Sequence, residues 1–390
     1  MRRMLLSMMF AAAALLASCS TPYHPPTIIA PEGAPARFLG IADNLDPSRL
    51  VDILIVHGMC TTYADWATTA VKNLFQALGG DPAKVNLLPR EIAPNGIQLY
   101  QQTLALPRGS IRVNAIVWSP LTTPLKMQLC YDETDKSRSC KAAGNQSPYP
   151  FQRAAQNQKY KDTLLDDCLS DAMIYAGRAH EPISAKLQEA ILQALGSSGG
   201  AAPSARFVDA VAAIPVTQPL VVITESLGSK MAFDAIYKMS TNPATRDAGV
   251  RTFARVTQIF MYANQIPILG LAHQALDGSN ERLAASNSGF PPDPIQALLQ
   301  VHGQATRFAG TPESKQIVAF TDPNDLLSFT LSTSPFKPLG GASIVDVAVS
   351  NEQTYLGQLE SPATHTAYPL NPDVSSLVAC GSPKSAKCAP

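Results

Sequence analysis

A serine stands where an apolar stretch of the chain gives way to a helical pattern. Residues 220–223 are apolar, the sequence T-E-S-L-G follows at residues 224–228, and apolar residues then recur with helical spacing. A serine at a sharp strand-to-helix turn with small neighbours is typical of the nucleophile elbow G-x-S-x-G, which holds the hydroxyl clear of the backbone. The chemistry predicted for Ser226 is therefore nucleophilic attack on a carbonyl carbon, assisted by the positive end of the helix that follows.

This motif departs from the elbow pattern at one position. Thr224 occupies the place of the first glycine, while Gly228 matches the second. A β-branched side chain crowds a tight turn, so we expect the turn to be slightly opened or the packing around it to be adjusted. A serine that only caps a helix after a strand is a common alternative, and the motif alone does not distinguish the two.

An earlier predicted strand ends in a histidine and a glycine. Residues 51–56 are mostly apolar, and His57-Gly58-Met59 follows them. Together with the serine motif, this pattern resembles the α/β-hydrolase superfamily, specifically its lipase-like and esterase-like members. The resemblance implies an oxyanion hole formed by the backbone N–H groups of Met59 and Leu227, with His57 orienting the loop rather than acting as a base. By itself, His-Gly also fits a tight turn after a buried strand.

The resemblance also implies a catalytic acid in a loop that follows a late strand. Residues 316–320 predict that strand, and the loop after it contains Asp322 and Asp325. Asp325 is the preferred acid because it precedes the apolar pair 326–327, as in the acid loop of the superfamily, and Asp322 is the alternate. Either carboxylate also fits an ordinary turn, since Asp-Pro-Asn-Asp is typical turn composition.

The catalytic base is predicted from the order of residues along the chain. In the superfamily the serine comes first, then the acid, then the histidine. Six histidines are present, and His365 is the only one that follows Asp325. His365 lies in a predicted loop after the last strand, where the resemblance places the base. The resemblance therefore implies a triad of Ser226, Asp325 and His365 that acts on a carboxylic ester.

Strands and helices alternate along the chain, as is needed to position these residues. Runs rich in Val and Ile predict six strands buried on both faces, at residues 51–56, 113–118, 220–224, 256–262, 316–320 and 344–349. Helical patterns predict helices at residues 65–78, 163–176, 183–195, 204–213, 227–239 and 294–301. The alternation predicts an α/β protein with a mostly parallel sheet flanked by helices. The resemblance specifies the α/β-hydrolase fold, with a large helical cap insertion.

Two intervals are too long for simple crossovers between strands. We expect cap insertions at about 120–218 and 264–315 within a hydrolase domain at 50–376, followed by a C-terminal tail at 377–390. The side chains of Met59 and Trp66 and the apolar run 266–271 are candidates for the walls of an acyl-binding pocket. A place in the core fits them equally well.

The N-terminus predicts export and a lipid anchor. Two arginines precede an uncharged apolar run at 4–17, which is shorter than a membrane-spanning helix needs and leads to small residues. The L-A-S-C sequence that ends at Cys19 resembles the bacterial lipobox, which implies a signal peptide at 1–18, cleavage before Cys19 and lipid attachment to its sulfur. Ser20 then points, by analogy, to the outer membrane and a protein that faces the periplasm. An ordinary signal peptide followed by an unrelated cysteine is the alternative.

The segment after Cys19 and the remaining cysteines also fit an exported protein. Residues 19–49 contain six prolines and predict an extended tether. In an oxidising compartment the other six cysteines are expected to form structural disulfides. The sequence does not choose among the possible pairings outright. The close partners across loop-like segments are Cys130 with Cys140 and Cys380 with Cys388, which would leave Cys60 with Cys168.

Composition and the missing motifs exclude several kinds of partner. Lys plus Arg and Asp plus Glu both total 30, so there is no basic excess to neutralise a nucleic acid backbone. The sequence has no zinc motif, no P-loop, no dinucleotide-binding motif and no calcium loop, and we expect no cofactor and no metal. The expected partners are a small-molecule or lipid ester and the membrane, reached through the anchor at Cys19.

These observations predict an envelope-anchored serine hydrolase that cleaves carboxylic esters. Transfer of the acyl group to another alcohol would use the same residues. The alternative is a non-catalytic lipoprotein of the same fold, acting as a binding or scaffold module of the envelope. Thr224 in the elbow is the feature that favours this alternative.

Overall fold

The computed structural model describes most of the 390 residues of the chain. The described ranges are 23–30, 36–62, 64–92, 96–144, 149–196, 204–274, 276, 290–291, 293–304, 315–334, 340–351 and 363–388. The predicted signal peptide and Cys19 lie outside them. None of the helices within these ranges has the length and apolar character required to cross a bilayer.

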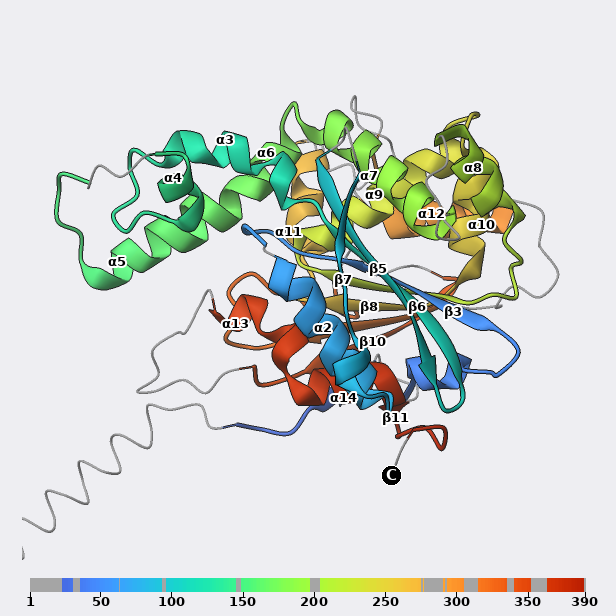
Figure 1. Ribbon diagram of the computed structural model, residues 1–390. Coiled ribbons are helices and arrows are strands. Elements are labelled where there is room, and N and C mark those ends of the chain that lie inside the picture. The colour runs from blue at the N-terminus through green and yellow to red at the C-terminus, as the bar shows by residue number, and fades with distance from the viewer. Residues whose placement is uncertain are drawn as a thin grey trace, which may run out of the picture.

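A nine-stranded sheet runs through the centre of the molecule in the order β1-β10-β9-β8-β7-β3-β6-β5-β4 (Figure 1). The strands are β1 (Thr27–Ile29), β3 (Leu50–Val56), β4 (Pro89–Ile92), β5 (Ile97–Leu106), β6 (Gly109–Val117), β7 (Leu220–Glu225), β8 (Val256–Tyr262), β9 (Lys315–Thr321) and β10 (Ala342–Ala348). The six strands from β10 to β6 are mutually parallel, and β1, β5 and β4 pair in antiparallel fashion at the two ends. The mostly parallel sheet is therefore confirmed.

All six predicted strands are present, and they are the six parallel ones. β3 and β7 are buried along nearly their whole length, because helices cover both faces of the sheet. The sequence did not indicate β5, in which Gln and Thr interrupt the apolar residues and half of the side chains are partly or fully exposed. Half-exposed strands of this kind lack the continuous apolar run that marked the others.

Helices pack on both faces of the sheet (Figure 1). One face carries α7 (His180–Gly196), α8 (Ser204–Ala213), α9 (Leu227–Thr241), α10 (Arg246–Arg255) and α12 (Pro294–Gln304), and the other carries α2 (Ala64–Ala77) and α14 (Pro372–Cys380). Two separate clusters of buried apolar side chains fill the layers between helices and sheet. The five predicted helices that match single elements are α2, α7, α8, α9 and α12, whereas α10 and α14 were not predicted.

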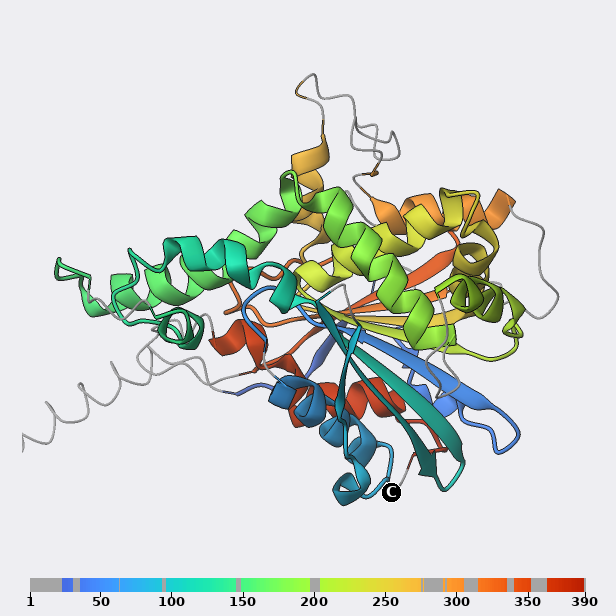
Figure 2. The same cartoon turned by 45° about the horizontal axis from the view of Figure 1, so that its top comes forward.

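The long insertion between β6 and β7 has two parts. Its second part, α7 and α8, packs on the sheet, whereas the described residues 119–144 and 149–176 form an arm that extends beyond the sheet (Figures 1 and 2). The arm contains η3 (Ser119–Leu121), α3 (Thr123–Lys126), η4 (Met127–Leu129), α4 (Arg138–Ala142), α5 (Ala155–Lys159), the π-helix η5 (Tyr160–Leu169) and α6 (Ser170–Ala176). The predicted helix at 163–176 corresponds to η5 and α6. A large helical insertion between β6 and β7 is thus confirmed.

Three disulfides join the six described cysteines. They are Cys60–Cys168, Cys130–Cys140 and Cys380–Cys388. These are the pairings that proximity in the sequence favoured. The first differs from the other two because it spans 108 residues and ties the loop after β3 to the arm.

The described parts of the proline-rich segment differ from the expected tether. β1 pairs with β10, β2 (Phe38–Leu39) pairs with β11 (Gly381–Ser382), and Ile41 in η1 (Ile41–Asn44) is fully buried. Apolar side chains in this segment find a place against the sheet, so residues well before the expected boundary at 50 belong to the domain. The expected tail begins inside α14, and the disulfide Cys380–Cys388 holds the residues that follow.

Candidate active site

Ser226 lies between the end of β7 and the start of α9. Its backbone has φ 52° and ψ −127°, a positive φ that is rare for a residue other than glycine. Its N–H donates to the carbonyl oxygen of Tyr262 at 2.7 Å, which ties the turn to the end of β8. This is the sharp strand-to-helix turn that the sequence predicted.

The turn accommodates Thr224 through a hydrogen bond. The Thr224 side chain is fully buried, and its hydroxyl lies 2.9 Å from the hydroxyl of Ser229 in the first turn of α9. On the other side, a Cβ at Gly228 would lie 2.3 Å from the carbonyl oxygen of His57, so only glycine allows α9 to approach the loop after β3 this closely. The Thr224 hydroxyl therefore has a partner within the elbow, although the residue takes the place of the first glycine.

His365 connects Ser226 with Asp325. The His365 Nε2 atom lies 2.8 Å from Ser226 Oγ, and Nδ1 lies 2.9 and 3.0 Å from the two carboxylate oxygens of Asp325. An ionised carboxylate only accepts hydrogen bonds, so Nδ1 carries the proton and Nε2 is the acceptor that faces the serine hydroxyl. His365 lies in α13 (Ala363–Thr366), and all three side chains are almost completely buried.

Further donors hold the Asp325 carboxylate in place. The Leu327 N–H donates to Oδ1 at 3.0 Å, and the Tyr368 hydroxyl donates to Oδ2 at 3.0 Å. The Tyr368 oxygen in turn accepts the Asp322 N–H at 2.8 Å. Burial raises the pKa of Tyr368 well above its ordinary value, so the hydroxyl remains a donor. Sequence reasoning did not identify Tyr368; its position three residues after His365 is the signal that was available.

The alternate acid has a different role. The Asp322 carboxylate accepts the N–H groups of Asn324 at 2.8 Å and of Asn351 at 2.6 Å. It thereby joins the loop after β9 to Asn351, which follows β10. Asp325, and not Asp322, is the carboxylate that contacts His365.

Side chains accept three backbone N–H groups of the loop of residues 57–62. The acceptors are Asp171 for Cys60 at 2.8 Å, Asp167 for Thr61 at 3.0 Å and Ser119 for Thr62 at 3.2 Å. Within the described part of the chain the Met59 and Leu227 N–H groups have no acceptor. Since buried N–H groups are normally paired, two unpaired donors are unusual. They are available to an oxygen atom of a bound molecule.

His57 orients this loop. Its Nε2 accepts the N–H groups of Trp118 at 2.9 Å and Ser119 at 3.1 Å, and its Nδ1 lies 3.0 Å from the Thr62 hydroxyl. The ring stacks on Trp118 with centroids 4.7 Å apart. Burial lowers the pKa of His57 to about 3, so the ring is neutral and its lone pair is occupied. It therefore does not act as a base.

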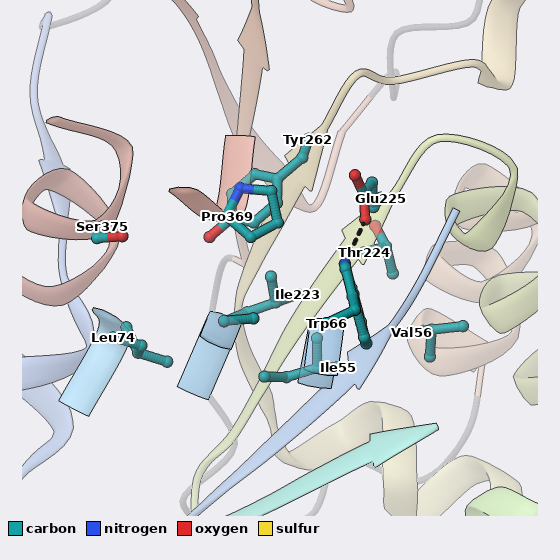
Figure 3. A pocket seen from close by; sticks show the side chains of 11 residues that line it. Ile55, Val56, Trp66, Leu74, Ile223, Thr224, Glu225, Tyr262, Pro369 and Ser375 are labelled. Atoms are coloured by element: carbon teal, nitrogen blue, oxygen red, sulfur yellow. Dashed lines mark hydrogen bonds between the residues drawn. The ribbon is translucent and has the colours of Figure 1, made fainter. Parts of the chain in front are cut away.

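Glu225 is a second buried carboxyl group beside Ser226. Figure 3 shows its hydrogen bond from the indole N–H of Trp66, which is 3.1 Å long. Burial raises the pKa of Glu225 to about 7, although His365 and the N–H groups of Trp66 and Gly58 lower it. Glu225 also lines a narrow, largely apolar cavity of about 20 Å³ between the sheet, α2 and α14, with room for about one water molecule.

The candidate pocket walls belong largely to the core. Met59 and Ile266 are both buried in the apolar cluster beneath the helices of the α9 face, and Trp66 packs against the cluster on the opposite face. In α11 (Ile266–Gly270) and η6 (Leu271–His273), Ile268 and Leu271 are exposed. The structure thus favours a core role for Met59 and Ile266.

The fold is the α/β-hydrolase fold. A mostly parallel sheet is flanked by helices, and a serine follows a central strand at a strained turn into a helix. An aspartate after β9 and a histidine near the end of the chain complete the order Ser, Asp, His. One fold serves many functions, so the fold defines the architecture of the protein and not its activity.

Comparisons with known proteins add little to the assignment of the fold. No protein-family model matches the chain, and no curated protein matches it. The solved structures that match include the crystal structure of a dienelactone hydrolase from Anabaena variabilis, with 10% sequence identity over 89% of this chain and 95% of that chain. The TM-score of 0.28 is too low to carry an argument, so the assignment rests on the sheet order and the positions of the site residues.

Proposed function

We propose that the protein is a serine hydrolase that cleaves carboxylic esters. The observation that carries this proposal is the buried chain of hydrogen bonds from Ser226 through His365 to Asp325, with distances of 2.8 and 2.9 Å. In the proposed reaction, Ser226 Oγ attacks the ester carbonyl carbon while His365 Nε2 takes its proton. Asp325 remains ionised, holds the Nδ1–H tautomer and stabilises the imidazolium ion that forms.

The remaining steps use the same residues. His365 returns the proton to the leaving alcohol, which leaves an acyl group on Ser226. It then takes a proton from water, whose oxygen attacks the acyl carbon. The bond between the acyl carbon and Ser226 Oγ breaks, His365 returns the proton to Ser226 Oγ, and the carboxylic acid is released. Another alcohol in place of water would give acyl transfer. We assign the two unpaired N–H groups of Met59 and Leu227 to the developing oxyanion of both steps.

We further propose that the protein is anchored to the bacterial envelope by lipid on Cys19 and faces the periplasm from the outer membrane. The support is the lipobox-like sequence before Cys19. Three disulfides among the described cysteines are consistent with an oxidising compartment. The proposed substrate is accordingly a small-molecule or lipid ester.

A fluorophosphonate probe tests the chemistry directly. The purified protein should be labelled at Ser226, the Ser226→Ala variant should not be labelled, and His365→Ala should be labelled far more slowly. Ser240→Ala is the matched control, because Ser240 is a buried serine near the other end of α9, its hydroxyl donates to the Ile236 carbonyl oxygen, and its loss should leave labelling intact. Esters of p-nitrophenol with increasing acyl length would then define the substrate class.

One outcome favours the non-catalytic alternative. If the folded protein is not labelled at Ser226 and hydrolyses none of the esters, the protein is a non-catalytic binding or scaffold module. A labelled serine other than Ser226 would also contradict the proposal.

A further inference from the structure

The arm contacts the loop that carries Met59. The arm leaves the sheet after β6 and extends away from it, as Figure 2 shows, but η5 and α6 at its base lie against residues 60 and 61. Each contact is made by a side chain of the arm with the loop backbone or with the side chains of Cys60 and Thr61. The arm is therefore joined to the proposed oxyanion site.

A disulfide forms the first contact. Cys60 directly follows Met59 and is bonded to Cys168 of η5, and both cysteines are buried. The backbone of Cys60 has φ 81°, one of three positive φ values at residues other than glycine in the described part of the chain. Such a conformation persists only where surrounding contacts fix it, and the disulfide is one of them.

Two carboxylates form the second set of contacts. Asp171 Oδ2 accepts the Cys60 N–H at 2.8 Å, and Asp167 accepts both the Thr61 N–H and the Thr61 hydroxyl. Lys126 Nζ lies 2.8 Å from Asp167 and 3.1 Å from Asp171, so one cation contacts both carboxyl groups and offsets one negative charge. Asp171 is fully buried, and a buried carboxylate without this lysine would be costly.

These contacts enclose the Met59 amide. Gly58 packs against the elbow on one side, where an added Cβ would lie 2.7 Å from Ser226 Cβ and 3.0 Å from the Glu225 carbonyl oxygen, and Asp171 holds the Cys60 N–H on the other. A peptide group between two fixed neighbours has little freedom to rotate, so the direction of the Met59 N–H is set by these contacts. An oxyanion donor must be aimed before the reaction to be effective.

We infer that Asp171 and the disulfide Cys60–Cys168 are positioning residues for the Met59 amide, which makes the arm a required part of the hydrolase site. The inference rests on the proposed function. Loss of a whole oxyanion donor lowers kcat by about 10²–10³-fold. Because loss of the disulfide or of Asp171 would misdirect the Met59 donor without removing it, we expect a decrease of about 10–100-fold.

The test compares two disulfides of the same arm. Cys60→Ala/Cys168→Ala should lower kcat by about 10–100-fold with little change in KM, and Asp171→Ala should do the same. Affinity for a trifluoromethyl ketone, which forms an oxyanion on Ser226, should fall by the same factor as kcat/KM. The matched control is Cys130→Ala/Cys140→Ala, which removes a disulfide that does not touch the loop and should leave both quantities nearly unchanged.

Reduction provides a second measurement on the unaltered chain. Dithiothreitol adds two electrons and two protons to Cys60–Cys168, breaks its S–S bond to give two thiols, and is itself oxidised to a cyclic disulfide. Activity should fall as this bond opens and return when oxidised glutathione restores it. Peptide mass analysis measures the fraction of the bond that is open. The Cys130→Ala/Cys140→Ala variant should respond in the same way, whereas Cys60→Ala/Cys168→Ala should not respond.

The outcomes separate this inference from the proposed function. A wild-type protein without labelling at Ser226 and without esterase activity overturns both. An active wild-type protein in which both disulfide variants lose activity equally, or in which only KM changes, overturns the positioning role alone. Thermal unfolding of each variant identifies any general loss of stability.

Discussion

At the scale of single residues, the two aspartates after β9 are distinguished by what each carboxylate holds. Asp325 contacts the His365 ring and is itself fixed by the Leu327 N–H and the Tyr368 hydroxyl. Asp322 accepts two backbone N–H groups and joins two segments of chain. One residue thus serves the proposed chemistry and the other serves the loop that presents it.

Substitution of each aspartate by asparagine should separate these roles. Asp325→Asn should lower kcat by about 10⁴-fold while circular dichroism stays native, because an amide no longer selects the Nδ1–H tautomer. Asp322→Asn should keep most of the activity but lose about 1–3 kcal/mol of unfolding free energy, because its new N–H₂ group faces a backbone N–H. The reverse ranking of activities would transfer the acid role to Asp322.

Glu225 predicts a pH dependence of stability. Its pKa is about 7 in the folded protein and about 4.5 when exposed, so between these values the folded state retains a proton that the unfolded state has lost. Stability relative to Glu225→Gln should therefore fall as pH rises through this window, by on the order of 2 kcal/mol between pH 5 and pH 8. Glutamine keeps the acceptor for the Trp66 N–H, so the variant isolates ionisation.

Urea unfolding at several pH values measures this difference. The control is Glu181→Gln at an exposed position on α7, for which the difference from wild type should not vary with pH. A constant difference for Glu225→Gln as well would show that Glu225 is already ionised in the folded protein.

At the scale of elements, the site depends on the close approach of α9 to the loop after β3. The two proposed oxyanion donors come from these two elements, Met59 from the loop and Leu227 from the first turn of α9. Gly228 permits the approach, since an added Cβ would lie 2.3 Å from the His57 carbonyl oxygen and 2.8 Å from that of Val56. Both neighbours are backbone atoms and have little freedom to move.

Gly228→Ala should therefore separate the two elements. We expect a loss of about 1–3 kcal/mol of unfolding free energy and a clear decrease in kcat, because the Met59 and Leu227 N–H groups move apart. Esterase assays and thermal unfolding measure both effects. Gly340→Ala, which meets no atom within 4 Å, is the control and should change neither. Unchanged activity in Gly228→Ala would place the oxyanion donors elsewhere.

At the scale of the whole molecule, Tyr23 and His24 contact the domain only a few residues after the proposed anchor. The Tyr23 hydroxyl donates to Asp373 of α14, and the His24 N–H donates to Ser350. Only three residues separate Tyr23 from Cys19, a reach of about 14 Å at full extension. A lipid on Cys19 would thus hold the domain next to the membrane surface rather than at the end of a long tether.

Replacement of the anchor residue tests this arrangement. Cys19→Ser should remove lipidation and release a soluble periplasmic form. Without the cysteine sulfur, the mature chain carries no acyl group that can insert into the bilayer. Cell fractionation and incorporation of radiolabelled palmitate measure the two effects. A Cys19→Ser protein that remains with membranes and carries palmitate elsewhere would contradict the lipobox interpretation.

The sequence by itself determined the parallel strands, the α/β class and the candidate Ser226, His365 and Asp325. Strands buried on both faces need continuous apolar runs, and an elbow needs a serine between a strand and a helix, so both leave local patterns. Spacing also favoured the disulfide partners within each of the two short loops, without excluding the other pairings. Strands with exposed side chains, such as β5, left no such pattern.

Only the tertiary structure decided how these residues are held. The contact of Asp325 with His365 joins residues 40 positions apart, and that of Asp171 with the Cys60 N–H joins residues 111 apart. The place of Tyr368 between two aspartates, and the packing of residues 27–29 on β10, likewise depend on segments distant in sequence. Such contacts arise when whole elements pack together, and no local pattern of residue types records them.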